Sequence, residues 1–461
     1  MGVSALVSMM YHIDAAFFPL LISAVVTCIV GVAPLLFLPK QIQVSNREGY
    51  VILFSAWLLS CLFGMLPYLF WGGEFSIVNA WYESVSGYTT TGSTILTDIE
   101  ALPHGLLFWR SSTHWIGGLG VMLLMLIVSP EVGAARLRLS KMEISSLSKD
   151  HFNFRMQRIL RIVAVVYFGI TLAATFAYFL AGMNLFDAVN HAFSTVATGG
   201  FSTKNASILA YHSTAIEVVS MFFMLVSGMH FGLIYMTVTG KSATVFRTPV
   251  ARYYLFSLLF AGLLITLNLI FNASESSFWP ALCKGMFQSI SIGTTTGFAT
   301  ADSSIWPPFC IIILLFLSIQ CGCAGSTSGG IKVDRLLIFW ASLKSQIQKQ
   351  LHSKAFVPVK LGGSILEPDM VTSVNVFLVF YFLIILFIST ILTFFGHNLL
   401  DGLTSSVAHM GNVGPAFGSV GSLSNYAHFS ALSKCVLTVE MLLGRLEIWG
   451  FLMIFYIYRW R

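Results

Sequence analysis

Long apolar segments recur along this chain and constrain its fold more than any other feature. A run of about 20 apolar residues is long enough for one helix to cross a bilayer. Charged residues make up only 10% of the 461 residues, whereas soluble proteins carry roughly 25%. The composition therefore predicts a multi-pass helical membrane protein and excludes soluble, disordered, collagen-like and disulfide-stapled secreted classes. The apolar ranges are 16–38, 50–71, 107–129, 159–181, 212–238, 252–273, 308–321, 372–395 and 430–458.

The charged residues segregate between the two sets of connecting segments. Basic residues concentrate at 40–47, 136–161, 241–252, 332–360 and 459–461. Cytoplasmic loops of membrane proteins carry this excess of Lys and Arg, so we expect these segments to face the cytoplasm and anionic lipid. The net charge of +6 is explained by topology, and we expect no nucleic acid partner. The opposite side carries the acidic residues Glu74, Asp98, Glu100, Asp187, Asp302 and Asp401.

Four shorter segments between the apolar runs resemble one another and end in small polar residues and glycine. They cover 79–94, 187–203, 284–300 and 401–418. Aligned on their glycines, they recur at intervals of 108, 97 and 117 residues, which indicates an internal repeat. The aligned glycines are Gly92, Gly200, Gly297 and Gly414.

Each aligned segment begins with a short helix that cannot span the membrane. About 12 residues at 1.5 Å each fall well short of the roughly 30 Å hydrocarbon core. Asn79, Asp187 and Asp401 stand at the outer starts, where they suit helix N-caps, whereas the third repeat has Lys284. Irregular backbone at membrane depth must be buried in protein or wetted, so four re-entrant segments predict a central aqueous path. Four unrelated amphipathic surface loops are the disfavoured alternative.

The predicted architecture is an all-α integral membrane protein with four pseudo-symmetric helix–pore-loop–helix repeats around a central ion pore. One extra helix, residues 16–38, precedes the repeats. We expect this helix to be retained rather than removed as a signal peptide, because a signal peptide begins with basic residues and no Lys or Arg precedes residue 16. With that single helix, the N-terminus lies outside. The predicted boundaries are 1–44 for the N-terminal region, 45–135, 136–240, 241–360 with a gating loop, and 361–461 for the repeats.

The chemistry of the four segments favours a monovalent cation. Backbone carbonyls replace the hydration shell of an ion, glycine permits the backbone angles that aim them inward, and Thr adds hydroxyl oxygens. The negative ends of the short-helix dipoles also favour a cation. The four strands contain no Lys or Arg and no ring of carboxylates, which argues against anions and divalent cations. The candidate ion-binding residues are Thr90, Thr91, Gly92, Thr198, Gly199, Gly200, Thr295, Thr296, Gly297, Asn412, Val413 and Gly414.

Two further features interrupt the apolar runs. Residues 321–332 contain four glycines, which cannot form a stable helix interior, so this stretch is either a break in the span or a packed kink. Arg445 lies within the last apolar run, and a charge at membrane depth is a functional candidate. Pairing of Arg445 with Glu440 or Glu447 is an equally good structural explanation. We expect His114, His191 and His409 to be packed rather than ligating, and we assign no metal to Cys321 and Cys323.

The motifs TTTGST, ATGGFST, TTTGFAT and GNVGPAFG resemble the four selectivity filters of the Trk/Ktr/HKT superfamily of potassium transporters, over about 45–461. Residues 114–124 and 321–332 point to the bacterial TrkH branch. Glycine at all four aligned positions goes with potassium preference in that superfamily. The resemblance makes residues 321–332 a gating loop with Arg445 nearby. The gating residues it implies are Cys321, Gly322, Cys323, Ala324, Gly325, Ser326, Thr327, Gly329, Gly330, Lys332 and Arg445.

The resemblance also implies partners and a location. TrkH-like proteins are homodimers in the bacterial cytoplasmic membrane and dock a ring of nucleotide-binding subunits called TrkA. This chain has no G-x-G-x-x-G or P-loop motif and no cofactor is expected in it; potassium is its substrate. The basic cytoplasmic loops, including Arg136, Arg138 and Lys141, and the loop 340–370 are possible contacts. Family members carry two helices before the first repeat, so residues 1–10 look like a remnant of one.

Other functions fit the sequence less well. An intramembrane enzyme would need paired catalytic groups within the spans, and we find no such pair at convincing spacing. A secondary transporter of a small solute would show two inverted halves rather than four repeats. Water or urea transport lacks the matching repeat number. A sodium or non-selective monovalent cation transporter remains the main alternative to potassium uptake.

Overall fold

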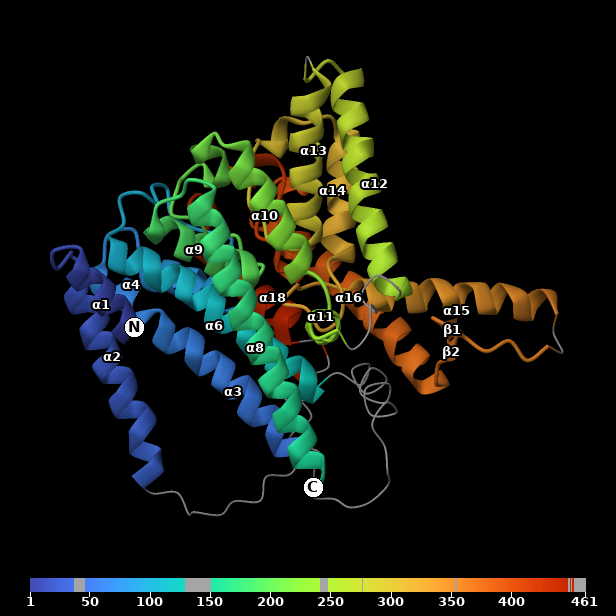
Figure 1. The fold of residues 1–461 in the computed structure, drawn as a ribbon, viewed down its shortest axis with the longest axis horizontal. Helices are drawn as coiled ribbons and strands as arrows, with labels where there is room; N and C mark the ends of the chain where they lie inside the picture. The colour runs from blue at the N-terminus through green and yellow to red at the C-terminus, as the bar shows by residue number, and fades with distance from the viewer. Residues whose placement is uncertain are drawn as a thin grey trace.

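The computed structural model describes residues 1–36, 46–128, 151–240, 248–275, 277–352, 355–446, 448, 450 and 451. The basic cluster of Arg136, Arg138 and Lys141 lies outside these residues, as does Glu447. Helices form nearly all of the regular structure in the described part (Figure 1). A two-stranded antiparallel hairpin joins β1 (Lys360–Leu361) to β2 (Ser364–Ile365), with Lys360 opposite Ile365.

The described helices follow the same order four times: a long helix, a short helix, an irregular strand and a further helix. In the first repeat α4 (Leu66–Trp71) intervenes after the long helix. The first repeat holds α3 (Asn46–Gly64), α5 (Ile77–Tyr88) and α6 (His104–Val128); the second holds α8 (His151–Leu180), α9 (Leu185–Val196), α10 (Thr214–Ser227) and α11 (Phe231–Val238). The third holds α12 (Pro249–Phe271), α13 (Phe278–Gly293), α14 (Pro308–Gln320) and α15 (Val333–Leu351); the fourth holds α16 (Pro368–Phe394), α17 (Leu399–Met410) and α18 (Ala431–Leu446).

Four stretches of the described helices are long and apolar enough to cross a membrane by themselves, at Phe54–Trp71, Leu160–Leu180, Pro249–Phe271 and Pro368–Phe394. Large apolar side chains remain exposed on these helices, for example Leu172, Phe256 and Phe387, as expected for surfaces that face lipid. These helices are those of an integral membrane protein.

The apolar run 212–238 forms two helices rather than one straight helix. The chain bends by 105° between α10 and α11. His230 caps the new helix, because its Nδ1 accepts the backbone N–H of Gly232 at 3.0 Å. The Gly228 carbonyl, left outside α10, accepts the backbone N–H of Cys323 at 2.9 Å. The bend thus gains partners that compensate the interrupted helix.

The N-terminal residues are more structured than the sequence suggested. Residues 1–10, interpreted as a remnant, contain the helix α1 (Gly2–Met10), which packs on α2 (Phe17–Val32) and α6. Asp14 in the connecting turn accepts the backbone N–H of Gly105 at 2.9 Å. The predicted helix 16–38 is shorter in the structure: α2 ends at Val32 and a 3₁₀ turn, η1 (Ala33–Leu36), follows.

The third repeat departs from the others in shape. Its helices α12, α13 and α14 stand side by side, whereas α15 runs away from the body of the molecule (Figure 1). Residues 321–332 connect α14 to α15 without helical structure. The predicted break in this apolar run is confirmed, and a simple kink is excluded.

Candidate ion pore

Three of the short helices begin with a side-chain cap, but the capping residues differ from the predicted ones. Ser76, Asn184 and Asn398 are the N-caps. Their side-chain oxygens accept the backbone N–H groups of Asn79, Asp187 and Asp401, three residues farther along. The prediction that these latter residues cap the helices is wrong by one turn, because a capping side chain reaches the third residue of its helix. Ser277 occupies the N-cap of α13 without a side-chain hydrogen bond.

The two aspartates instead tie their helix starts to the chain that returns from the membrane centre. Asp187 Oδ1 accepts the hydroxyl of Thr203 at 2.6 Å. Asp401 Oδ1 accepts the backbone N–H of Ser419 at 2.9 Å, and its Oδ2 accepts the Ser419 hydroxyl at 2.7 Å. The second and fourth segments are therefore each tied back to the start of their own short helix.

After each short helix the backbone makes the same turn in all four repeats. A backbone N–H in the strand reaches back five residues to a helix carbonyl, as from Thr91 to Ser86 at 2.9 Å. The residue two positions before each aligned glycine has φ between 51° and 61°, and the glycines have φ between 79° and 90°. Positive φ is unusual for Thr and Asn, so the repetition marks a specified conformation. The residues with this angle are Thr90, Thr198, Thr295, Asn412, Gly92, Gly200, Gly297 and Gly414.

The four strands form a closed ring. We call them the glycine strands: 90–93, 198–201, 295–298 and 412–415. A Cβ on any aligned glycine would overlap a backbone carbonyl of the next strand in chain order, and that of the fourth would overlap a carbonyl of the first. No residue larger than glycine fits at these four positions without moving a neighbouring strand. The carbonyls approached in this way belong to Gly199, Thr296, Val413 and Thr91.

Hydrogen bonds hold neighbouring strands together at their outer ends in the same cyclic order. The chain that follows the first glycine strand is joined to the chain that follows the second, because the backbone N–H of Ile99 donates to the Asn205 side chain at 2.6 Å. The chain that follows the fourth glycine strand is joined to the chain directly after the first, because the backbone N–H of Tyr426 donates to the Thr94 carbonyl at 2.8 Å. The remaining two links are Ala299 N–H to the Ser207 hydroxyl at 3.2 Å and Ser303 N–H to the Ser422 hydroxyl at 3.0 Å.

A hollow of about 110 Å³ opens above the ring, and all four aligned glycines line it. We call it the outer cavity. Its lining consists largely of backbone, hydroxyl and amide groups, with Arg110 and Lys204 as the basic side chains. The four short helices end next to the ring, so the negative ends of their dipoles point toward it.

The threonine hydroxyls of the glycine strands differ in their hydrogen bonding. Thr91 and Thr296 share hydrogen bonds with Thr89 and Thr294, at 2.7 and 2.8 Å. Thr90 Oγ1 is buried and has no hydrogen-bond partner among the described residues. An unpartnered hydroxyl buried beside the ring is available to an ion or a water molecule.

Residues 321–332, which we call the broken segment, lie directly beneath the ring. The Thr327 hydroxyl donates to the Val196 carbonyl at the end of α9 at 3.0 Å, and a Cβ on Gly329 would overlap the Gly411 carbonyl. Thr295 of the third strand donates to the Ser328 hydroxyl at 3.1 Å. The broken segment thus contacts the second, third and fourth repeats at once. Within it, Cys321, Gly325, Gly330 and Lys332 have positive φ.

Arg445 reaches the same region from α18. It is 1% exposed, and its three guanidinium nitrogens have no hydrogen-bond partner within the described residues. The adjacent Gly444 packs against Met410 and Asn412 of the fourth repeat. The suggested pair with Glu440 is not formed, because Glu440 instead accepts the Ser406 hydroxyl at 2.5 Å. The other suggested partner, Glu447, lies outside the described residues.

The three histidines near the strands are packed and hydrogen-bonded, as predicted. His114 stacks on Phe201 with ring centroids 3.9 Å apart. His191 contacts the Asp187 carbonyl at 2.8 Å. His409 contacts the Tyr82 hydroxyl at 2.7 Å. These contacts account for the burial of all three rings.

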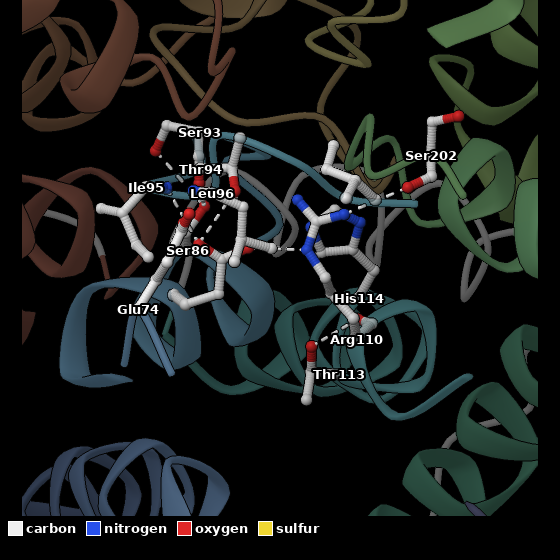
Figure 2. A network of polar contacts seen from close by, with 12 residues as sticks. Glu74, Ser86, Ser93, Thr94, Ile95, Leu96, Arg110, Thr113, His114 and Ser202 are labelled. Atoms are coloured by element: carbon white, nitrogen blue, oxygen red, sulfur yellow. Dashed lines mark hydrogen bonds and ion pairs between the residues drawn. The ribbon is translucent and has the colours of Figure 1, made fainter. Parts of the chain in front are cut away.

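A buried ion pair beside the outer cavity was not predicted from the sequence. Arg110 Nε lies 2.6 Å from Glu83 Oε1, and the side chains are 2% and 0% exposed. Figure 2 shows Arg110 between the end of the first glycine strand and Ser202, which directly follows the second glycine strand. The sequence signal for this pair was the presence of one charged residue, Glu83 or Arg110, in each of two otherwise apolar helices. Ser328 was also missed, although it lies between two predicted gating residues.

Comparison with known proteins decides the family. The model of the cation transport protein family TrkH matches residues 20–271 and 277–459. The chain belongs to the TrkH family of cation transport proteins. It is a transporter rather than an enzyme. The TrkH-type fold is confirmed by the crystal structure of the potassium transporter TrkH from Vibrio parahaemolyticus, which superposes with a TM-score of 0.90 at 31% identity, covering 100% of this chain and 95% of that one.

Curated TrkH relatives cover nearly the whole chain as well. The Trk system potassium uptake protein TrkH of Salmonella typhimurium is 33% identical over 91% of this chain and 87% of its own length. The protein of the same name from Halomonas elongata is 33% identical over 94% and 90%. Trk system potassium uptake protein TrkG of Escherichia coli is 31% identical over 94% and 90%.

Proposed function

We propose that this TrkH-family protein takes up potassium through the ring of glycine strands, which forms the selectivity filter of a single central pore. The closed contact of the four aligned glycines with one another's strands carries this proposal. A ring of carbonyls from four equivalent strands replaces the hydration shell of a monovalent cation without binding it too tightly to leave. The relatives named above are potassium uptake proteins, which supports potassium as the substrate.

The proposed path runs from the outer cavity through the ring and past the broken segment. In this proposal the carbonyls of Thr91, Gly199, Thr296 and Val413 belong to the ion-binding set, and the short-helix dipoles add a favourable field. The broken segment and Arg445 then control passage on the cytoplasmic side of the ring. An inward-negative potential contributes about 2.3 kcal/mol per charge for each 100 mV, so uptake needs no ATP hydrolysis in this chain.

The proposal includes the surroundings of the protein. We place it in the bacterial cytoplasmic membrane as a homodimer that docks a TrkA-like nucleotide-binding subunit. The repeat boundaries predicted from the sequence, with the gating loop in the third repeat, belong to the same proposal. No further cofactor is needed for the path described.

Ion flux into liposomes that contain only this protein tests the proposal. We expect rubidium and potassium to enter much faster than sodium, and Gly200→Ser to relax that preference, because the added side chain displaces the Thr296 carbonyl. Equal sodium flux in the original protein would point to a sodium or non-selective transporter. If no ion enters, adding the TrkA-like subunit distinguishes a closed gate from a wrong assignment: continued absence of flux contradicts the proposal.

A further inference from the structure

The ion pair between Arg110 and Glu83 lies where it can influence every ion that reaches the ring. Glu83 also accepts the backbone N–H of Ile95 at 3.1 Å and the Thr94 hydroxyl at 3.0 Å. Arg110 donates from Nη1 to the Ser202 carbonyl at 3.1 Å, and its guanidinium lies 3.6 Å from the centre of the Phe201 ring. The two charges therefore join the exits of the first and second glycine strands at the wall of the outer cavity.

The second and third repeats make the equivalent connection without a charge, through His191 and Gln288. Nine residues before the aligned glycine, where the first repeat has Glu83, the others have His191, Gln288 and Ser405. Gln288 donates to the Ala301 carbonyl at 2.9 Å and so ties its helix to the chain beyond its own strand. Since a neutral amide suffices for this connection in the third repeat, the charge of Glu83 must have a further consequence.

The outer cavity has an unusual electrostatic character for the mouth of a cation path. Its described lining residues include the basic Arg110 and Lys204 and no acidic side chain. Glu83, which does not line the cavity, neutralises the charge of Arg110. Glu100 lies 3.4 Å from Lys204 and neutralises its charge. The balance between these groups fixes the potential that an entering cation meets.

We propose that the Arg110–Glu83 pair is a specificity determinant that limits the access of divalent cations to the pore mouth. This inference rests on the proposed function. A change of potential multiplies the local concentration of a monovalent cation by a factor and that of a divalent cation by the square of that factor. A pore mouth without net negative charge therefore favours potassium over calcium or magnesium. The pair gives this neutrality at the point where the strands converge.

Calcium block of rubidium uptake tests the charge balance directly. In liposomes, Arg110→Gln leaves Glu83 without its cationic partner. We expect calcium to block uptake by this variant at about three- to tenfold lower concentration than in the original protein. Glu83→Gln leaves Arg110 uncompensated and is expected to shift block in the opposite direction. The double variant Glu83→Gln/Arg110→Gln removes both charges and is expected to restore the original sensitivity.

Opposite shifts separate a charge effect from a structural one. A role in packing alone would move both single variants in the same direction and would not be corrected in the double variant, and that result would overturn the inference. Should the buried variants fail to fold, Lys204→Gln, at a partly exposed site on the same wall, is expected to lower the blocking concentration of calcium as Arg110→Gln does. Unchanged block in a folded Lys204→Gln protein would overturn the inference.

The failure of the proposed function gives a different result. If the original protein with its TrkA-like subunit takes up no rubidium at all, the pore assignment and this inference are both wrong. If rubidium enters but calcium block is the same in every folded variant, only the inference about Arg110 and Glu83 is wrong.

Discussion

The backbone amide of Gly329 donates a hydrogen bond to the Thr295 hydroxyl at 3.1 Å, so the broken segment is bound directly to the third glycine strand. Thr295 in turn donates to Ser328, the preceding residue of the segment. The ring and the segment beneath it therefore form one hydrogen-bonded unit. Any movement of the broken segment away from the ring must break these bonds, as the gate proposed at this place requires.

We expect Gly329→Ala to increase potassium flux in the absence of a regulatory subunit. An added Cβ would overlap the Gly411 carbonyl and crowd Asn412. Movement of the broken segment away from the ring relieves this overlap. Rubidium uptake into liposomes measures the effect, and we expect a rise of several-fold.

A matched control for this substitution is Gly169→Ala. Gly169 lies in α8, and nothing stands within 4 Å of an added Cβ there. Alanine is favoured over glycine within a helix, so this variant should fold at least as well and transport at the original rate. A lowered or unchanged uptake in Gly329→Ala, with the control behaving normally, would argue against the broken segment as an obstruction.

Replacing Arg445 with methionine is expected to increase both stability and flux. The side chain is buried and its guanidinium has no hydrogen-bond partner among the described residues. An apolar residue of similar length removes the cost of burying a charge, which is worth about 1–4 kcal/mol in comparable cases. It also removes the positive charge that, in the proposed path, opposes cations beneath the ring. Thermal unfolding in detergent and rubidium uptake measure the two effects.

Arg445→Lys serves as the charge-preserving control. It keeps the positive charge, so we expect flux close to that of the original protein. If the lysine and methionine variants conduct equally, the charge of Arg445 does not control passage. A clear loss of stability in the methionine variant would indicate a partner for Arg445 outside the described residues.

The four aligned glycines could be found from the sequence because their recurrence after short helices is a local pattern. Glycines at a regular spacing after short helices leave few conformations, and the aligned glycines do line one cavity. The positive φ of Thr90, Thr198 and Thr295 was not predicted, because threonine seldom adopts it without support from the tertiary structure.

Contacts between distant parts of the chain were beyond the sequence. Glu83 and Arg110 are 27 residues apart on different helices, and nothing local indicates that they meet. Arg445 and Glu440 are close in sequence yet do not pair, because the Ser406 hydroxyl of α17 donates a hydrogen bond to the Glu440 carboxylate. The bend at Gly228 depends on the broken segment, about a hundred residues away, whose Cys323 satisfies the freed carbonyl.

Asp401→Ala is expected to destabilise the fourth repeat. Asp401 accepts hydrogen bonds from the Ser419 backbone and hydroxyl and from the Asn398 side chain. Loss of these buried, charge-assisted bonds should lower the free energy of unfolding by about 1–3 kcal/mol. The thermal midpoint in detergent reports the loss.

Asp369→Ala is the control for this loss. Asp369 lies exposed in the first turn of α16, and its removal should change stability by at most about 0.5 kcal/mol. Equal midpoints for the two variants would contradict the role assigned to Asp401 in closing its re-entrant segment.

Location of the transported ion tests the central claim most directly. Crystals of the protein grown in rubidium and measured at the rubidium absorption edge would reveal bound ions by anomalous scattering. We predict density on the axis of the ring, surrounded by the carbonyls of Thr91, Gly199, Thr296 and Val413. Rubidium bound elsewhere in the protein, with an empty ring at concentrations that support uptake, would contradict the claim that the four glycine strands form the ion path.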